Sequence, residues 1–108
     1  MIELTGSEKQ ISWASEIRAK FVENCDKVIA KVQAGQASYI HPKVRARFCE
    51  MVAERREKVL AIAEAARIID LRNSLNLSGT EQTIVQRVQT DEKAKAAMAA
   101  PRQREVQA

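Results

Sequence analysis

The sequence has few of the residues that interrupt or cross-link a chain. Its 108 residues include three glycines, two prolines, two cysteines, and only one Trp, one Tyr and two Phe. This composition excludes collagen-like, disordered and disulfide-rich proteins. No apolar run approaches the ~18 residues that a membrane-spanning helix needs, and residues 1–6 do not form a basic and then apolar leader. We therefore expect one cytoplasmic domain over residues 1–108 that does not enter a membrane.

The residues needed for common catalytic and metal sites are also sparse. His41 is the only histidine, and no phosphate-binding glycine-rich loop, HExxH motif or nucleophile motif is present. Cys25 and Cys49 lack the CxxC spacing of a metal or redox site, and both fall in segments that predict helices. We expect two reduced thiols in the core, no catalytic residues, no bound metal and no cofactor.

Apolar residues recur at steps of three and four along three segments, which is the spacing of one face of an α-helix. The pattern predicts an all-α fold in which a long antiparallel helical hairpin is followed by a third, C-terminal helix. Residues 83–88 carry enough β-branched side chains for a strand, but no partner strand is visible. The expected helices span residues 7–34, 42–75 and 80–100, and residues 101–108 are expected to form a mobile tail.

The first helix has recognisable signals at both ends. A capping box formed by either Thr5 with Glu8 or Ser7 with Gln10 satisfies the free amides of its first turn. Gly35 follows the last apolar residue of the stripe, a common position for glycine after a helix.

The ends of the other two helices follow from similar signals. The second helix starts at Pro42 and runs unbroken to about residue 75, or it bends near residue 55, where Arg55 interrupts the apolar face. The third helix is expected to begin at about residue 80, after Gly79, with Ser78 and Glu81 at the spacing of a capping box.

The charges of the second helix fall into two basic rows. Eighteen Lys and Arg against fourteen Asp and Glu give a net charge of +4, which permits an anionic partner without requiring one. On a helical wheel the rows lie on either side of the apolar stripe. They either cover the core with long side chains or bind successive phosphates of a nucleic acid. One row is Arg45, Arg56 and Arg67, and the other is Lys43, Arg47, Lys58 and Arg72.

The loop before the second helix adds two ring side chains next to these rows. Tyr39 and His41 can stack on an unpaired base while the basic side chains hold its backbone. Alternatively, Tyr39 and Ile40 close the end of the hairpin core. With so few aromatic residues, binding to a strand would be mainly electrostatic.

Two segments resemble small proteins encoded by phages and other bacterial mobile elements. Residues 6–18, GSEKQISWASEIR, resemble the opening GSEKQ-x-x-WA-x-x-I of that group, and residues 65–73, AARIIDLRN, resemble its A-x-x-IID-x-RN segment. The chain departs from the pattern at Leu71, where related proteins have Asn, and its second helix is longer. The group includes anti-CRISPR proteins directed against type I systems, one of which occupies the single-stranded DNA exposed in the R-loop.

The resemblance implies a non-enzymatic inhibitor of a type I CRISPR surveillance complex in the host bacterial cell. Its partner is then the complex itself or single-stranded DNA. One alternative is a helical module that forms a homodimer through its remaining apolar surface, and another is a small DNA-binding regulator, although no usual helix-turn-helix is visible. The candidate contact residues are Lys43, Arg45, Arg47, Arg56, Lys58, Arg67, Tyr39 and His41.

The shared residues also have a structural interpretation. In a hairpin, the end of the second helix returns to the start of the first. Asp70 would then accept hydrogen bonds from the first amides of that helix or from the Trp13 indole, and Arg72 would pair with Glu8. We expect these four side chains to form a polar clasp, with Trp13 at the edge of the core; the alternative is that Trp13 contacts a partner.

Overall fold

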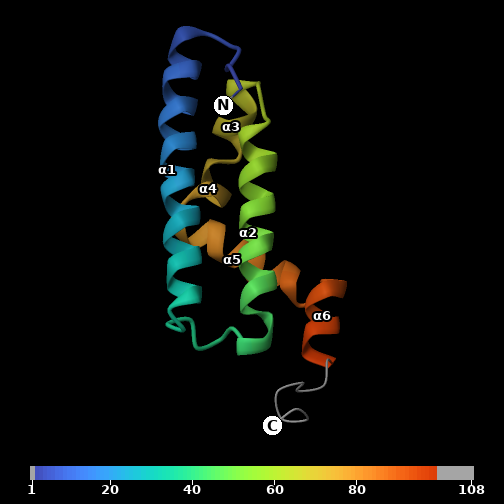
Figure 1. Cartoon of the computed structure of the whole chain (residues 1–108). Coiled ribbons are helices and arrows are strands. Elements are labelled where there is room, and N and C mark those ends of the chain that lie inside the picture. The colour runs from blue at the N-terminus through green and yellow to red at the C-terminus, as the bar shows by residue number, and fades with distance from the viewer. Residues whose placement is uncertain (1, 100–108) are drawn as a thin grey trace.

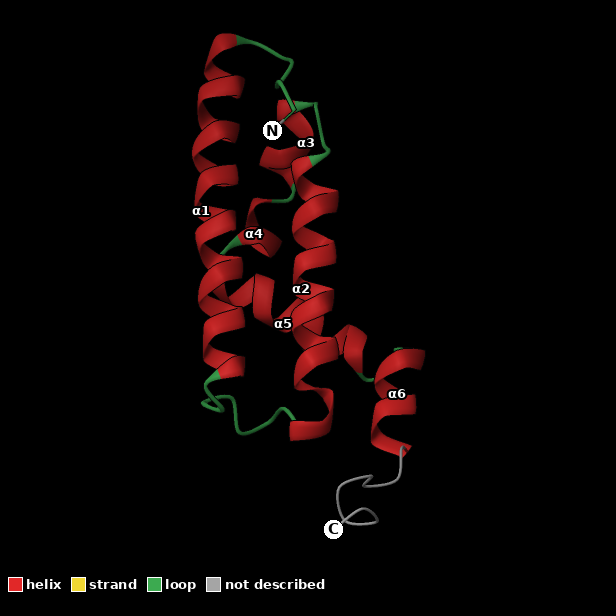
Figure 2. Ribbon diagram, viewed as in Figure 1, coloured by secondary structure: helices red, strands yellow, loops and turns green. Residues whose placement is uncertain are grey.

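Two long helices, α1 and α2, run side by side in opposite directions, and shorter helices pack against them (Figure 1). The computed structural model describes residues 2–99, so the predicted tail at 101–108 lies outside the described residues. Within residues 2–99 the elements are all helical, which confirms the all-α prediction (Figure 2). They are α1 (Glu8–Gln33), the 3₁₀ helix η1 (Pro42–Val44), α2 (Arg45–Leu60), α3 (Ala65–Asp70), α4 (Arg72–Leu75), α5 (Leu77–Val88) and α6 (Glu92–Ala99).

Local side-chain and backbone bonds fix both ends of α1. Of the two capping boxes that the sequence allows, the structure contains that of Ser7 and Gln10: the Gln10 amide donates to Ser7 Oγ at 3.2 Å, and the Ser7 amide donates to Gln10 Oε1 at 3.1 Å. Gly35 ends the helix with a φ of +73°, a conformation that favours glycine. The amides of Gly35 and Gln36 donate to the carbonyls of Val32 and Lys31, which is the Schellman arrangement.

The prediction of one helix over residues 42–75 is wrong, and so is the alternative of a break near residue 55. Arg55 lies inside α2, and the helix ends later, at Leu60. The segment before α1 causes the break: the Thr5 amide donates to the Ala63 carbonyl at 2.7 Å, and the Ala65 amide donates to the Thr5 carbonyl at 2.9 Å. Because these backbone groups bond to Thr5, they are not available for a continuous helix, and α3 starts in a new direction.

The predicted third helix is two helices, and its start is also different. Asn76, not Ser78, caps α5, because Asn76 Oδ1 accepts a hydrogen bond from the Gly79 amide at 2.7 Å. Gly79 therefore lies in the first turn of the helix rather than before it. α5 ends at Val88, and α6 begins where Asp91 Oδ2 accepts from the Ala94 amide at 2.9 Å.

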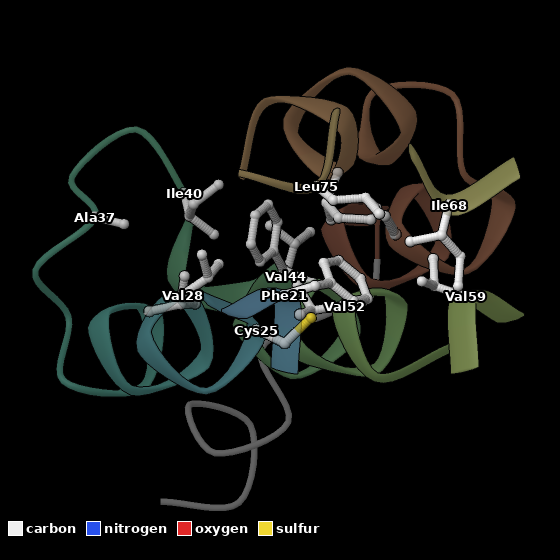
Figure 3. Close-up of a cluster of buried hydrophobic side chains, with 14 of the residues drawn as sticks. Phe21, Cys25, Val28, Ala37, Ile40, Val44, Val52, Val59, Ile68 and Leu75 are labelled. Atoms are coloured by element: carbon white, nitrogen blue, oxygen red, sulfur yellow. The ribbon is translucent and has the colours of Figure 1, made fainter. Parts of the chain in front are cut away.

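The core lies between α1, α2 and the shorter helices (Figure 3). Phe21 and Phe48 are completely buried at its centre. Cys25 is buried beside them and Cys49 is half-buried against the core, both as free thiols, as predicted. Burial raises the pKa of the Cys25 thiol to about 11, so this thiol stays protonated and unreactive at neutral pH. Other completely or almost completely buried side chains are Val28, Val32, Val52, Ile68, Leu75, Thr80 and Ile84.

Candidate nucleic-acid interface

The two basic rows predicted on residues 42–75 are not continuous, because the helix that would align them ends at Leu60. Arg45 and Arg56 remain on α2, whereas Arg67 lies on α3, beyond the change of direction at residues 61–64. Lys58 and Arg67 are exposed, and neither side chain makes a hydrogen bond or ion pair with another residue in the range 2–99. The row of three arginines is therefore a wrong prediction.

Arg47 is engaged inside the protein rather than available to a phosphate. Its Nε and Nη2 donate to the two oxygens of Asp91 at 2.7 and 3.0 Å, and its Nη1 donates to Glu54 at 2.8 Å. Only 13% of its side chain is exposed. The neighbouring Arg56 donates from Nη1 to Asp26 Oδ1 at 3.2 Å, so two of the predicted contact residues already have carboxylate partners.

The residues of the loop before η1 differ in whether they lie in the core or on the surface. Ile40 is buried and closes the end of the core, as expected, but Tyr39 is 51% exposed. The Lys31 ammonium donates to the Tyr39 hydroxyl at 3.3 Å and lies 5.4 Å from the centre of its ring. His41 Nδ1 accepts a hydrogen bond from the Lys43 amide, so the imidazole caps η1. Each ring thus makes a local contact, and the stacking role that the sequence suggests for Tyr39 and His41 stays a prediction.

The side chains that suit nucleic-acid binding gather elsewhere, in an open groove between α1 and the segment that contains α4 and the start of α5. Its volume is about 530 Å³. Basic and apolar groups dominate its lining, with one acidic side chain at its rim. The lining residues are Trp13, Glu16, Ile17, Lys20, Asn24, Lys27, Arg72, Leu75, Asn76 and Leu77.

Trp13 and Arg72 form the most distinctive contact of the groove. The Arg72 guanidinium lies 5.3 Å from the centre of the indole, within the range of a cation–π interaction. Arg72 Nη1 also donates to the Ile69 carbonyl at 2.9 Å, which holds the guanidinium in place. The indole remains 48% exposed, so it is not the core-edge anchor that we expected, and it is open to a ligand.

The predicted clasp is correct in bringing Trp13 and Arg72 together, and wrong in its bonds. Arg72 stacks on Trp13 and does not pair with Glu8. Asp70 is exposed and makes no hydrogen bond or ion pair with the described residues 2–99. The amides that Asp70 was expected to satisfy are served by the capping box of Ser7 and Gln10.

Two buried hydrogen bonds attach the end of α4 to α1 and to α5 along the wall of the groove. Asn24, buried on α1, donates from Nδ2 to the Leu75 carbonyl at the end of α4 at 3.0 Å. The buried Thr80 hydroxyl donates to the same carbonyl at 3.3 Å. Lys20 and Lys27 lie on the same face of α1, seven residues and therefore ~10 Å apart. The groove thus presents two spaced ammonium groups beside one exposed indole. The Lys20 ammonium also forms an exposed ion pair with Glu23 at 3.2 Å.

Sequence reasoning did not select Lys20, Lys27 or Leu77. Their signal was present in part, since Trp13, Lys20 and Lys27 recur at helical spacing along one side of the first helix. This side becomes a groove only because α4 and α5 fold back beside it, and that path depends on the break at residues 61–64.

Among residues 2–99, no group of three or more His, Cys, Asp or Glu side chains is placed to hold a metal ion. No helix in this part of the chain is both long and apolar enough to cross a bilayer. No protein-family model, curated protein or solved structure matches the chain.

Proposed function

We propose that the chain is a non-enzymatic inhibitor of a type I CRISPR surveillance complex, which acts in the host bacterial cytoplasm by binding exposed single-stranded DNA. One observation carries this proposal. Trp13 and Arg72 come from the two separate segments that resemble the phage-encoded group, and they meet in one groove at 5.3 Å. Residues shared for a common function would be expected to lie together in this way.

The chemistry of the groove favours a single strand over a duplex. An exposed indole can stack on an unpaired base, a contact worth about 1–3 kcal/mol, whereas the bases of a duplex are already stacked. Lys20 and Lys27 lie ~10 and ~21 Å along α1 from Trp13, so they can hold phosphates along a strand whose base stacks on the indole, and Arg72 adds a third positive charge. The exposed Lys58 and Arg67, together with the net charge of +4, support long-range attraction of the strand.

Binding of labelled oligonucleotides at two salt concentrations tests this function. We expect single-stranded DNA to bind more tightly than duplex DNA, and high salt to weaken both. The Trp13→Leu variant should lose about 5- to 160-fold in affinity for the single strand, which corresponds to one lost stacking contact. Tyr39→Leu is the matched control and should bind like the parent protein. A preference for duplex DNA, or equal binding by Trp13→Leu, would rule the proposal out.

A second groove favours the alternative of a homodimer without nucleic acid. It has a volume of about 510 Å³, lies between residues 39–44 and α6, and is lined mostly by apolar groups. Tyr39 and Met98 at this groove are both exposed, although large apolar side chains are usually covered. Light scattering over a range of concentrations distinguishes the candidates: a dimer that Met98→Glu dissociates, together with no binding to DNA, would favour the dimerisation module.

A further inference from the structure

A second cavity adjoins the groove that contains Trp13. It has a volume of about 280 Å³ and lies further along α1, beside the start of α5. Lys27 on α1 and Leu77 on α5 line both cavities, one from each wall. Leu77 is 47% exposed, so apolar surface that can contact a base continues past the indole. The second cavity therefore lengthens the groove along α1.

The face of α1 that carries Trp13 also carries three lysines, Lys20, Lys27 and Lys31. At roughly 100° per residue, the four side chains project within about 40° of one another. From position 13 to position 31 the helix rises by eighteen residues, or ~27 Å. A strand that lies along this face and stacks one base on the indole would meet the three lysines in turn.

The last of these lysines is held by a carboxylate of the opposite wall. Lys31 Nζ donates to Glu81 Oε2 at 3.0 Å and to the Tyr39 hydroxyl at 3.3 Å. Glu81 lies on α5 and is the acidic residue that lines the second cavity. Lys27, in contrast, forms no ion pair with the described residues 2–99. The Glu81 carboxylate thus offsets the charge of Lys31 and would repel a phosphate at this end of the groove.

We propose that the groove continues from Trp13 to the pair of Lys31 and Glu81, and that Glu81 limits the length of single-stranded DNA that the groove accepts. This inference rests on the proposed function. Stacked nucleotides advance about 3.4 Å each, so the ~21 Å from Trp13 to Lys27 takes about six nucleotides. The phosphates of the next two nucleotides would reach Lys31 and meet the Glu81 carboxylate.

Binding of oligothymidylates of four, eight and twelve nucleotides to the full chain tests this limit. Glu81→Gln keeps the size of the side chain and removes the repulsion. It should tighten binding of the two longer strands by about 2- to 5-fold, the effect of unit charges roughly 4–10 Å apart in water. Lys31→Gln leaves the carboxylate without its partner and should weaken binding of the same two strands. Neither change should alter the affinity for the shortest strand.

Glu92→Gln is the control, since it removes the same charge from α6, outside both cavities. Opposite effects of Glu81→Gln and Lys31→Gln distinguish the proposal from a merely structural ion pair, whose loss would act in one direction in both variants. Far-UV circular dichroism checks that both variants stay folded. An equal gain in Glu92→Gln, a gain at all three lengths, or a change of the same sign in both variants would overturn the length limit while leaving the proposed function in place. No DNA binding by the parent protein would discard both.

Discussion

Arg47 on α2 and Asp91 at the start of α6 form a two-point ion pair, with Nε 2.7 Å from Oδ2 and Nη2 3.0 Å from Oδ1. Asp91 Oδ2 also accepts from the Ala94 amide at 2.9 Å, so one carboxylate both caps α6 and attaches it to α2. The two side chains are only 13% and 16% exposed. An arginine that the sequence suggested for phosphate binding thus positions a helix.

We predict that Asp91→Asn loosens α6 while leaving the rest of the fold in place. The change removes the charge of the pair and weakens the cap, and α6 has few other contacts outside η1 and α2. Hydrogen exchange should become faster over residues 92–99 and stay unchanged in α1. Glu92→Gln, at an exposed position that pairs with Lys95 at 3.6 Å, is the control. Unchanged exchange in Asp91→Asn would show that other contacts hold the helix.

The same ion pair predicts a response to acid. Hydrogen bonds from the Arg47 guanidinium hold the pKa of Asp91 at about 2, below the ordinary value of 3.8. A carboxylate whose pKa is lowered by folding stabilises the folded state above its unfolded pKa, and this contribution disappears as the pH falls from about 4 to about 2. The difference in α6 exchange between the parent protein and Asp91→Asn should therefore vanish over this interval. A difference that is the same at pH 2 and pH 5 would contradict this assignment.

Gly79→Ala should destabilise the protein even though the residue lies in a helix. In an open helix this change stabilises by about 1 kcal/mol. Here an added Cβ would lie 2.6 Å from the Asn73 carbonyl oxygen and 2.8 Å from Ser74 backbone atoms, so α4 would have to move. We expect a loss of about 1–3 kcal/mol in urea unfolding, and little change for the neighbouring Ser78→Ala. A more stable Gly79→Ala would mean that α4 is not held against α5.

The parts of the fold that depend on nearby residues could be predicted from the sequence. The capping box of Ser7 and Gln10 and the glycine at position 35 act within a few residues of the helix ends that they define. The break after Leu60 could not be predicted in this way, since it depends on Thr5, which bonds to Ala63 from 58 residues away in the chain. The position of Gly79 inside α5 likewise depends on the close approach of α4.

The candidate site could also be predicted from the sequence only in part. The predicted hairpin indicated that the end of the second helix would return to the start of the first, and Trp13 and Arg72 do meet. Their contact is a guanidinium on an indole rather than a network of ion pairs, because the capping box already occupies the first amides of α1. The basic rows were drawn on a single helix, so the break at residues 61–64 removed their alignment.

The most direct test of the central claim compares two pairs of neutralised charges in single-stranded DNA binding over a range of salt. Lys20→Gln with Lys27→Gln removes the charges of the groove, and Arg56→Gln with Arg67→Gln removes the same number of charges from α2 and α3. We predict that the groove pair lowers the affinity more and reduces the slope of log affinity against log salt by roughly 0.7 for each lost phosphate contact. A larger loss for the pair on α2 and α3, with the groove pair binding like the parent protein, would contradict the account.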